Sequence, residues 1–363
     1  MANGDVTASR LGLINLGGSP QSNTDTNALF LKVFANEILT TFEEANVMKD
    51  LHTVRTIQSG KSAQFPVTGI ATAKYHTVGE DILESSTGYT SRIKHGEKVI
   101  NIDDVLLAST FIPNIDEMKN HYDVRSIYAK ELGKALAKRF DIATMKTLFA
   151  AAGADSEVGG AGGTTLDVSA GQAAGVSTAA NIISTITTIA QKFDENDVPS
   201  EDRFILLTPE SYYKLVSANT DAVSYTTTTS GVTGAGYSRL ENPLLTTGTA
   251  NMATASVAQV AGISVIKTNH LQDIIDSADL SSTATDDGAS NNDVNGGSGV
   301  GYNANFTGLQ ALAGTKQAIG TVKLMDLSTE SEYLMTKQGT ALVAKYAMGH
   351  GVLRPECAIK VVA

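Results

Sequence analysis

Gly60, Lys61 and Ser62 form the ending of a P-loop, the glycine-rich turn in which backbone N–H groups and a lysine hold a phosphate group. That motif needs a glycine five residues before the Gly-Lys pair, where this chain has Arg55. It also needs a helix directly after the turn, whereas Pro66 disfavours a helical continuation. We therefore do not expect nucleotide binding and predict a turn that leads into an extended strand.

The histidines do not gather into a site. They are spread along the chain without metal-ligand spacing: His52, His76, His95, His121, His270 and His350. Glu117 precedes His121 by four residues, but the sequence supplies no third ligand nearby. His350 stands between Gly349 and Gly351, and flanking glycines are typical of a tight turn.

Acidic residues are concentrated in residues 272–304, which hold six Asp and no Lys or Arg. This stretch lacks the register of a calcium loop, so cation binding by clustered carboxylates is kept only as an alternative. Cys357 is the single cysteine, and its apolar neighbours predict a buried, inert thiol. We predict that the chain is not an enzyme and has no catalytic, metal or cofactor site.

The composition limits which classes of partner the protein can bind. The net charge is −11, from 27 Lys and Arg against 38 Asp and Glu, and no basic block marks a DNA-binding face. An acidic protein can nevertheless lie beside DNA if its task is to avoid adhering to it. Because the chain shows no signal-peptide pattern and no apolar run of about 18 residues, we expect it to be made in the cytoplasm without a membrane partner.

The first half of the chain predicts three segments that are not stable without a partner surface. Residues 1–27 are polar and predict an arm that only a partner would fix. Residues 28–47 predict an amphipathic helix, whose Phe30 and Phe34 need a covering surface. Residues 62–103 predict a two-stranded ribbon with a charged tip. Because an isolated ribbon is marginally stable in water, we expect it to lie on a second copy of the protein.

The rest of the chain predicts a mixture of helices and strands. Apolar spacing indicates a long helix between Asp123 and Gly153, which can cap its two ends. Gly- and Ala-rich residues 153–178 predict a loop. The further elements expected are a helix over 181–193, a strand over 204–207, a helix that begins at Pro209 and is capped by Thr208, a strand over 260–271 and a closing strand in the last segment.

Several stretches resemble the major capsid proteins of T7-like short-tailed bacteriophages, the T7-like podoviruses. They are LFLKVFANEILTTF (29–42), SGKSAQFPV (59–67), EKVINIDD (97–104), NHYDVRS (120–126), GTVKLMDL (320–327) and AKYAMGHGVLRPE (344–356). They occur in family order, and the last is too distinctive for a generic fold pattern to produce. The likeness lapses at 153–178, 226–254 and 272–304, which affects the surface loops more than the core.

The resemblance implies an α+β fold of the HK97-like phage capsid type. Its parts would be an N-terminal arm with a short amphipathic helix over 1–60, an extended loop over 61–104, a peripheral domain over 105–200 with a spine helix over 123–152, an axial domain over 201–320 with insertions at 226–254 and 272–304, and a C-terminal strand over 321–363 that returns to the peripheral domain.

The resemblance also implies a function in assembly. Copies would form hexamers and pentamers of an icosahedral head that encloses double-stranded DNA without reading its sequence. The further partners expected are a scaffolding protein and a portal at one vertex, with a decoration protein left open, and the protein would reside in the virion after assembly in the bacterial cytoplasm. No Lys–Asn–Glu set for isopeptide cross-links can be assigned, and T7-like shells are expected to do without one.

The candidate assembly contacts are the two phenylalanines of the first helix and charged residues of the ribbon: Phe30, Phe34, Lys61, Glu80, Asp81, Glu84, Arg92 and Lys94. Three alternatives remain open. An encapsulin-like nanocompartment would share the fold but hold cargo enzymes in place of DNA. An NTPase would lose nucleotide binding on Lys61→Ala. A Thr- and Gly-rich adhesin or tail protein would form trimers or fibres.

Overall fold

The computed structural model describes residues 41, 46–71, 73–83, 89, 93–115, 124–156, 158–217, 259–276, 302, 306 and 308–363. The predicted arm, almost all of the predicted first helix and the insertion at 226–254 lie outside these residues, as does most of the insertion at 272–304.

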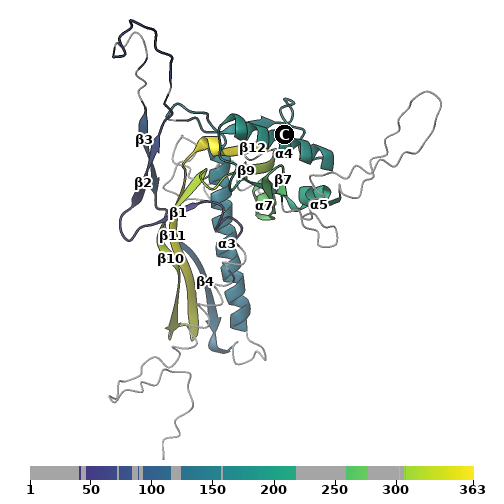
Figure 1. Cartoon of the computed structure of the whole chain (residues 1–363). Helices are drawn as coiled ribbons and strands as arrows, with labels where there is room; N and C mark the ends of the chain where they lie inside the picture. Colours follow the sequence, from purple (N-terminus) through teal and green to yellow (C-terminus); the bar gives the residue numbers. More distant parts are fainter. Residues whose placement is uncertain are drawn as a thin grey trace, which may run out of the picture. The chain divides into compact units, whose positions relative to one another are not determined.

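The described residues mix helices and strands (Figure 1). The helices are α3 (Val124–Ala151), α4 (Ala179–Glu195), α5 (Pro209–Ser217), α7 (His270–Asp276) and the 3₁₀ turn η3 (Pro355–Cys357). The strands are β1 (Thr53–Thr56), β2 (Ser62–Thr68), β3 (His95–Asn101), β4 (Leu106–Pro113), β5 (Thr164–Asp167), β6 (Phe204–Leu207), β7 (Gln259–Val260), β8 (Ile263–Lys267), β9 (Leu309–Gly314), β10 (Ile319–Leu334), β11 (Gly339–Val352) and β12 (Ala358–Val362).

The chain divides into two compact units, and several elements contribute to both. The first unit comprises Met1–Asn46, Val105–Phe140 and Met325–Ala347. The second comprises Val47–Asp104, Asp141–Leu324 and Met348–Ala363. The predicted division into arm, extended loop, peripheral domain and axial domain is a different partition and stays a prediction.

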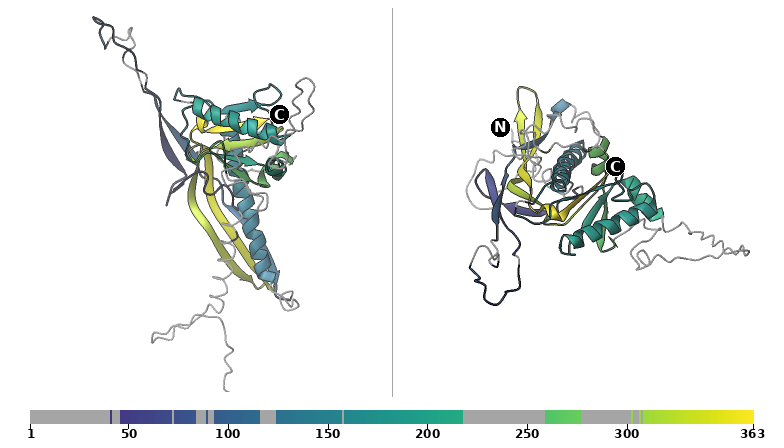
Figure 2. Two further views of the ribbon diagram at one scale, coloured as in Figure 1. Left: turned by 45° about the vertical axis from the view of Figure 1, so that its right-hand side comes forward. Right: turned by 90° about the horizontal axis from the view of Figure 1, so that it is seen from above.

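In the first unit, the N-terminal part of α3 runs along a sheet (Figure 2). β4 pairs antiparallel with β11 from Gly339 opposite Pro113 to Tyr346 opposite Leu106, and β10 is the next strand. Helix and sheet pack through apolar side chains, because the rings of Phe140 and Tyr346 meet edge to face with centroids 6.4 Å apart.

The second unit is built on a six-stranded sheet in the order β5-β12-β9-β6-β8-β7. All four residues of β6 are buried, as a central strand covered on both faces requires. α4 lies beside this sheet (Figure 2) and buries Ile182, Ile186, Ile189 and Phe193 on one face. The side chain of Thr178 accepts a hydrogen bond from the Asn181 amide and so caps α4.

Several predicted elements are confirmed. α3 lies within the predicted range 123–152, α4 extends the predicted 181–193 helix at both ends, and β6 has the predicted bounds. α5 begins at Pro209, and the Ser211 amide donates to the Thr208 hydroxyl at 3.4 Å, which is the predicted cap.

Other predictions are wrong in identifiable ways. The predicted loop at 153–178 contains strand β5, which pairs parallel with β12. The predicted strand at 260–271 is a tight hairpin of β7 and β8 followed by α7, because Ala261 and Gly262 turn the chain with φ angles of 51° and 78°. The first residues of the predicted insertion at 272–304 belong to α7.

The C-terminal segment also differs from its prediction. Residues 321–363 form most of β10, then β11 and β12, and so contribute three strands to two sheets, not one closing strand. His350 lies inside β11 and not in a turn. Its flanking glycines are explained by close packing, because a Cβ atom on Gly351 would be 2.6 Å from Cγ1 of Ile100.

Candidate assembly surface

The predicted ribbon is present as the antiparallel pair of β2 and β3, from Ser62 opposite Asn101 to Thr68 opposite His95 (Figure 1). Gly60 has a φ of 110°, a left-handed conformation suited to glycine, and the chain then enters β2. The prediction of a turn followed by a strand around Lys61 is therefore confirmed. No helix follows the turn, so the arrangement that a P-loop requires is not formed here.

The ribbon carries large apolar side chains that its own unit leaves exposed. They are Ile70, Tyr75, Val78, Ile82, Leu83, Ile93 and Val99. Tyr75 and Val78 are almost wholly exposed, at 102% and 96% of their reference areas. Scattered exposed apolar residues are ordinary, but a concentration of them on one projecting element indicates an interaction surface.

The charged residues predicted at the tip are organised by a tyrosine. The hydroxyl of Tyr89 donates to the Glu80 carboxylate and accepts a hydrogen bond from the Thr77 amide at 2.8 Å. The Asp81 carboxylate accepts from the Leu83 amide at 2.9 Å. Sequence reasoning missed Tyr89, since nothing in its spacing shows that the ribbon folds it back onto residues 77–80.

The structure separates the other predicted contacts. Lys61 is exposed just before β2, whereas Lys94 is exposed just before β3, at the opposite end of the strand pair. Lys94 is level with Gly69, eight residues from Lys61, so at about 3.4 Å per residue the two lysines lie roughly 27 Å apart along the ribbon. Phe30, Phe34, Glu84 and Arg92 lie outside the described residues.

A glycine-rich loop supports the ribbon where the strand pair ends. The Gly69 amide donates to the Lys94 carbonyl at 2.8 Å, and a Cβ atom on Gly69 would be 2.7 Å from the carbonyl oxygen of Val158. The same loop touches Gly96 less tightly, because a Cβ atom there would be 3.6 Å from Cγ1 of Val158. A residue larger than glycine therefore does not fit at position 69.

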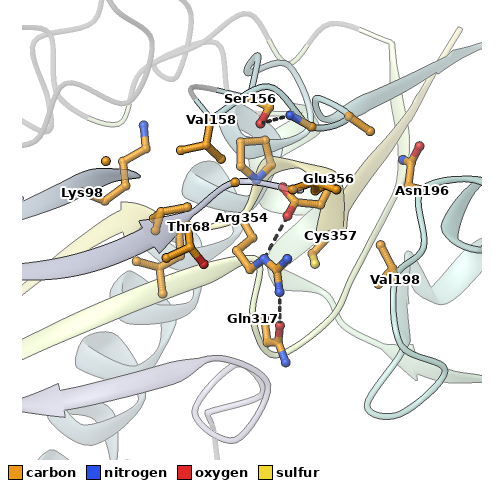
Figure 3. A pocket seen from close by; sticks show the side chains of 18 of the residues that line it. Thr68, Lys98, Ser156, Val158, Asn196, Val198, Gln317, Arg354, Glu356 and Cys357 are labelled. Carbon is orange, nitrogen blue, oxygen red and sulfur yellow. Dashed lines mark hydrogen bonds and ion pairs between the residues drawn. The ribbon is translucent and has the colours of Figure 1, made fainter. Parts of the chain in front are cut away.

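Beside this loop lies a groove of about 680 Å³ between the ribbon and the body of the second unit (Figure 3). It is lined by residues 65–70 of the ribbon, the loop around Val158, the turn at 196–199 and residues 353–357. Arg354 donates through Nε to the Glu356 carboxylate and through Nη1 to the Gln317 side chain, both at 2.8 Å. These two bonds fix one wall of the groove.

Cys357 also lines this groove, and it is buried as predicted. Burial raises the pKa of its thiol above the usual value, and the nearby Glu356 carboxylate acts in the same direction. A protonated thiol is a poor nucleophile, so the geometry gives Cys357 a packing role.

Within the residues that the structure describes, no three His, Cys, Asp or Glu side chains gather closely enough to hold a metal ion. Among the described helices, none is both long and apolar enough to cross a membrane.

Comparison with known proteins gives consistent matches along the chain. A family model described as Gp10A-like, major capsid protein, matches residues 64–362. The major capsid protein of Escherichia phage T7 is 35% identical over 361 residues, covering 96% of this chain and 95% of that protein. The major capsid protein of Enterobacteria phage T3 is 33% identical, covering 94% and 93%.

Solved structures agree with these matches. The capsid structure of the cyanophage P-SCSP1u is 37% identical with a TM-score of 0.66, covering 98% of both chains. The mature capsid of bacteriophage PhiM1 is 17% identical with a TM-score of 0.59, covering 87% of this chain and 86% of that chain, a likeness that concerns the fold alone. The predicted α+β, HK97-like capsid fold is therefore confirmed.

Proposed function

The chain belongs to the Gp10A-like family of major capsid proteins, and on this premise we propose that it builds the icosahedral head of a T7-like bacteriophage. The observation that carries the proposal is identity above 30% with two phage major capsid proteins along nearly the full length of each chain. These relatives are structural proteins, and we infer a structural and not a catalytic role. The encapsulin-like alternative is not favoured, because the relatives above 30% identity are capsid proteins of phages.

We propose that the shell is held by many repeated contacts between copies, arranged as hexamers and pentamers. The exposed apolar side chains of the ribbon support this. Covering Tyr75, Val78 and Leu83 with a neighbouring copy removes apolar surface from water and so lowers the free energy of the assembly. Contacts that are individually weak allow wrongly placed copies to dissociate before the closed shell makes binding effectively multivalent.

The predicted domain layout becomes part of this proposal. The ribbon over β2 and β3 would be the extended loop, α3 the spine of the peripheral domain, and the strands β6 to β9 part of the axial domain. The candidate contacts are those predicted from the sequence: Lys61, Glu80, Asp81 and Lys94 among the described residues, and Phe30, Phe34, Glu84 and Arg92 outside them.

The other partners follow from the same role. We propose assembly in the bacterial cytoplasm on a scaffolding protein, with a portal at one vertex and a site for a decoration protein on the outer loops. The net charge of −11 suits an inner wall along which DNA moves without adhering, since attraction to phosphates requires clustered Lys and Arg.

Electron microscopy of the chain produced together with its scaffolding protein tests the proposal. We expect closed icosahedral particles, and DNA inside those recovered from infected cells. Trimers or fibres would favour a tail protein, and shells filled with a cargo enzyme would favour a nanocompartment. A protein that stays monomeric at high concentration with scaffold present would refute the shell function.

A further inference from the structure

A buried carboxylate inside α3 holds the main chain at the point where the second unit begins. Asp141 is wholly buried. Its Oδ2 accepts a hydrogen bond from the Val47 amide at 2.9 Å, and its Oδ1 accepts one from the Met48 amide at 3.0 Å. Val47 and Asp141 each open a stretch of the second unit, so these bonds join two places where the chain enters it.

A third group bonds to the same carboxylate. Nδ1 of His270, the first residue of α7, lies 2.8 Å from Oδ2 of Asp141. Because an ionised carboxylate only accepts, Nδ1 must carry the proton that faces it. Asp141 therefore ties α3 both to the segment at 47–48 and to the start of α7.

The main chain of Met48 is also held on its other side. Its carbonyl oxygen accepts a hydrogen bond from the Leu51 amide at 3.1 Å and lies 2.6 Å from Nδ1 of His52. The Met48 side chain is fully buried. The N–H group, the C=O group and the side chain of Met48 are thus all held in place, one residue after Val47.

A buried carboxylate is costly to desolvate and is retained only where several donors satisfy it. A buried apolar side chain could fill the same space without that cost, but it could not orient two successive amides. Hydrogen bonds to a charged acceptor are directional and contribute more than neutral ones. Orientation of the chain at 47–48 is therefore the property that this arrangement adds.

We propose that Asp141 is a positioning residue for assembly, which fixes the course of the main chain at residues 47–48 and, through His270, links it to α7. The proposal rests on the shell function proposed above, because a shell of repeated contacts needs the same course of the chain in each copy. In a repeating shell, a small change of direction at residue 47 is repeated in each copy.

Asp141→Asn is the informative variant, because it keeps the size of the side chain and removes one acceptor oxygen. The amide of the variant can take two orientations. In one, its NH₂ group faces the Met48 amide, and in the other it faces the Val47 amide and His270, so a donor meets a donor in both. The variant therefore cannot hold both backbone amides. Ile186→Val in the core of α4 is the matched control, because it lowers stability without touching residues 47–48.

Hydrogen exchange on the full chain and electron microscopy of particles made with scaffold are the two readouts. In the wild type, we expect the Val47 and Met48 amides to exchange much more slowly than an unfolded peptide. In Asp141→Asn, we expect exchange at least about tenfold faster, since a hydrogen bond to a charged group is worth about 1.5–3 kcal/mol. We also expect misshapen shells, whereas Ile186→Val at a similar loss of Tm should form normal ones.

The outcomes separate the two proposals. Unprotected amides in the wild type would overturn the inference, even if Asp141→Asn fails to fold. Normal shells from Asp141→Asn, or equally misshapen shells from both variants at matched Tm, would reduce Asp141 to an ordinary stabilising residue. Failure of the wild type to form shells would refute the proposed function instead, and slow exchange at Val47 and Met48 would still show the local clamp.

Discussion

Gly349 of β11 lies directly against the main chain of Asn101 at the end of β3, so that a Cβ atom at position 349 would overlap the Asn101 carbonyl oxygen. This contact fixes the point from which the ribbon leaves the body of the second unit. It also explains why the stretch that reads as a glycine turn in the sequence is an extended strand.

We expect Gly349→Ala to lower the free energy of unfolding by about 1–3 kcal/mol or to prevent folding, because neither Asn101 nor β11 can move without breaking strand pairing. Thermal unfolding of the purified subunit measures the change. Val352→Ala, at the half-buried end of the same strand, is the control and should cost less. Equal Tm values for the two variants would contradict the tight contact.

Gly69→Ala should disturb the ribbon more than Gly96→Ala, although both positions face Val158. A Cβ atom at position 69 would be 2.7 Å from the Val158 carbonyl oxygen, whereas at position 96 the nearest atom would be at 3.6 Å, an ordinary contact. We expect the first variant to assemble poorly and the second to assemble normally. Particle yield in a sucrose gradient compares them, and matching yields would show that the loop does not support the ribbon.

Glu80→Lys should lower the yield of shells severalfold while leaving the Tm of the subunit almost unchanged. The ammonium group cannot accept the hydrogen bond that Tyr89 donates, so the tip of the ribbon loses its internal order. Exposed substitutions typically change stability by within about 0.5 kcal/mol. The matched control is Glu201→Lys, in an exposed turn before β6. A similar loss of shells from both variants would point to net charge, and not to the tip.

The helices could be predicted from the sequence because apolar spacing and capping residues are local features. α3 has apolar residues at helical spacing along its 28 residues, and Thr208 and Pro209 supply the cap and the first residue of α5. The turn at Ala261 and Gly262 could not be predicted in the same way. Its flanking residues are apolar on both sides, so the hairpin and a single strand give the same pattern.

The groove could not be predicted for a different reason. Its lining depends on Arg354 meeting Gln317, 37 residues away, and on Val158 meeting Gly69. Contacts between residues so far apart follow from the order of strands in a sheet and from their register. The spacing of residue types along the chain does not show either. The distinctive stretch at 344–356 contains Arg354 and Glu356, but it does not contain Gln317, to which Arg354 also donates.

Subunit stability should fall as the pH drops below about 6.5, because His350 resists protonation in the folded state. Burial, and then repulsion by His52, lowers the pKa of His350 from 6.5 to about 3. Below pH 6.5 the unfolded chain gains a proton that the folded chain does not, so the stability present at neutral pH is lost at about 1.4 kcal/mol per pH unit.

His350→Asn should flatten this dependence, although His52 will retain part of it, since burial lowers its pKa as well. Urea unfolding at pH 7 and pH 5 measures the difference. Val322→Ala, which destabilises the same core but keeps both histidines, should show the wild-type dependence. A variant without His350 that loses as much stability on acidification as the wild type would show that this residue is not the origin.

Cys357 should be unreactive toward thiol reagents at pH 8 in the folded subunit and reactive after unfolding in guanidinium chloride. It lies in the wall of the groove but is only 1% exposed, and burial raises the pKa of its thiol. Because it is the single cysteine, the labelling rate reports one site. Ser200→Cys combined with Cys357→Ser places the thiol in an exposed turn and should react at once, which shows that the reagent reaches native protein. Rapid labelling of Cys357 in the folded chain would mean that η3 opens toward the groove, and the wall held by Arg354 would then be a moving part.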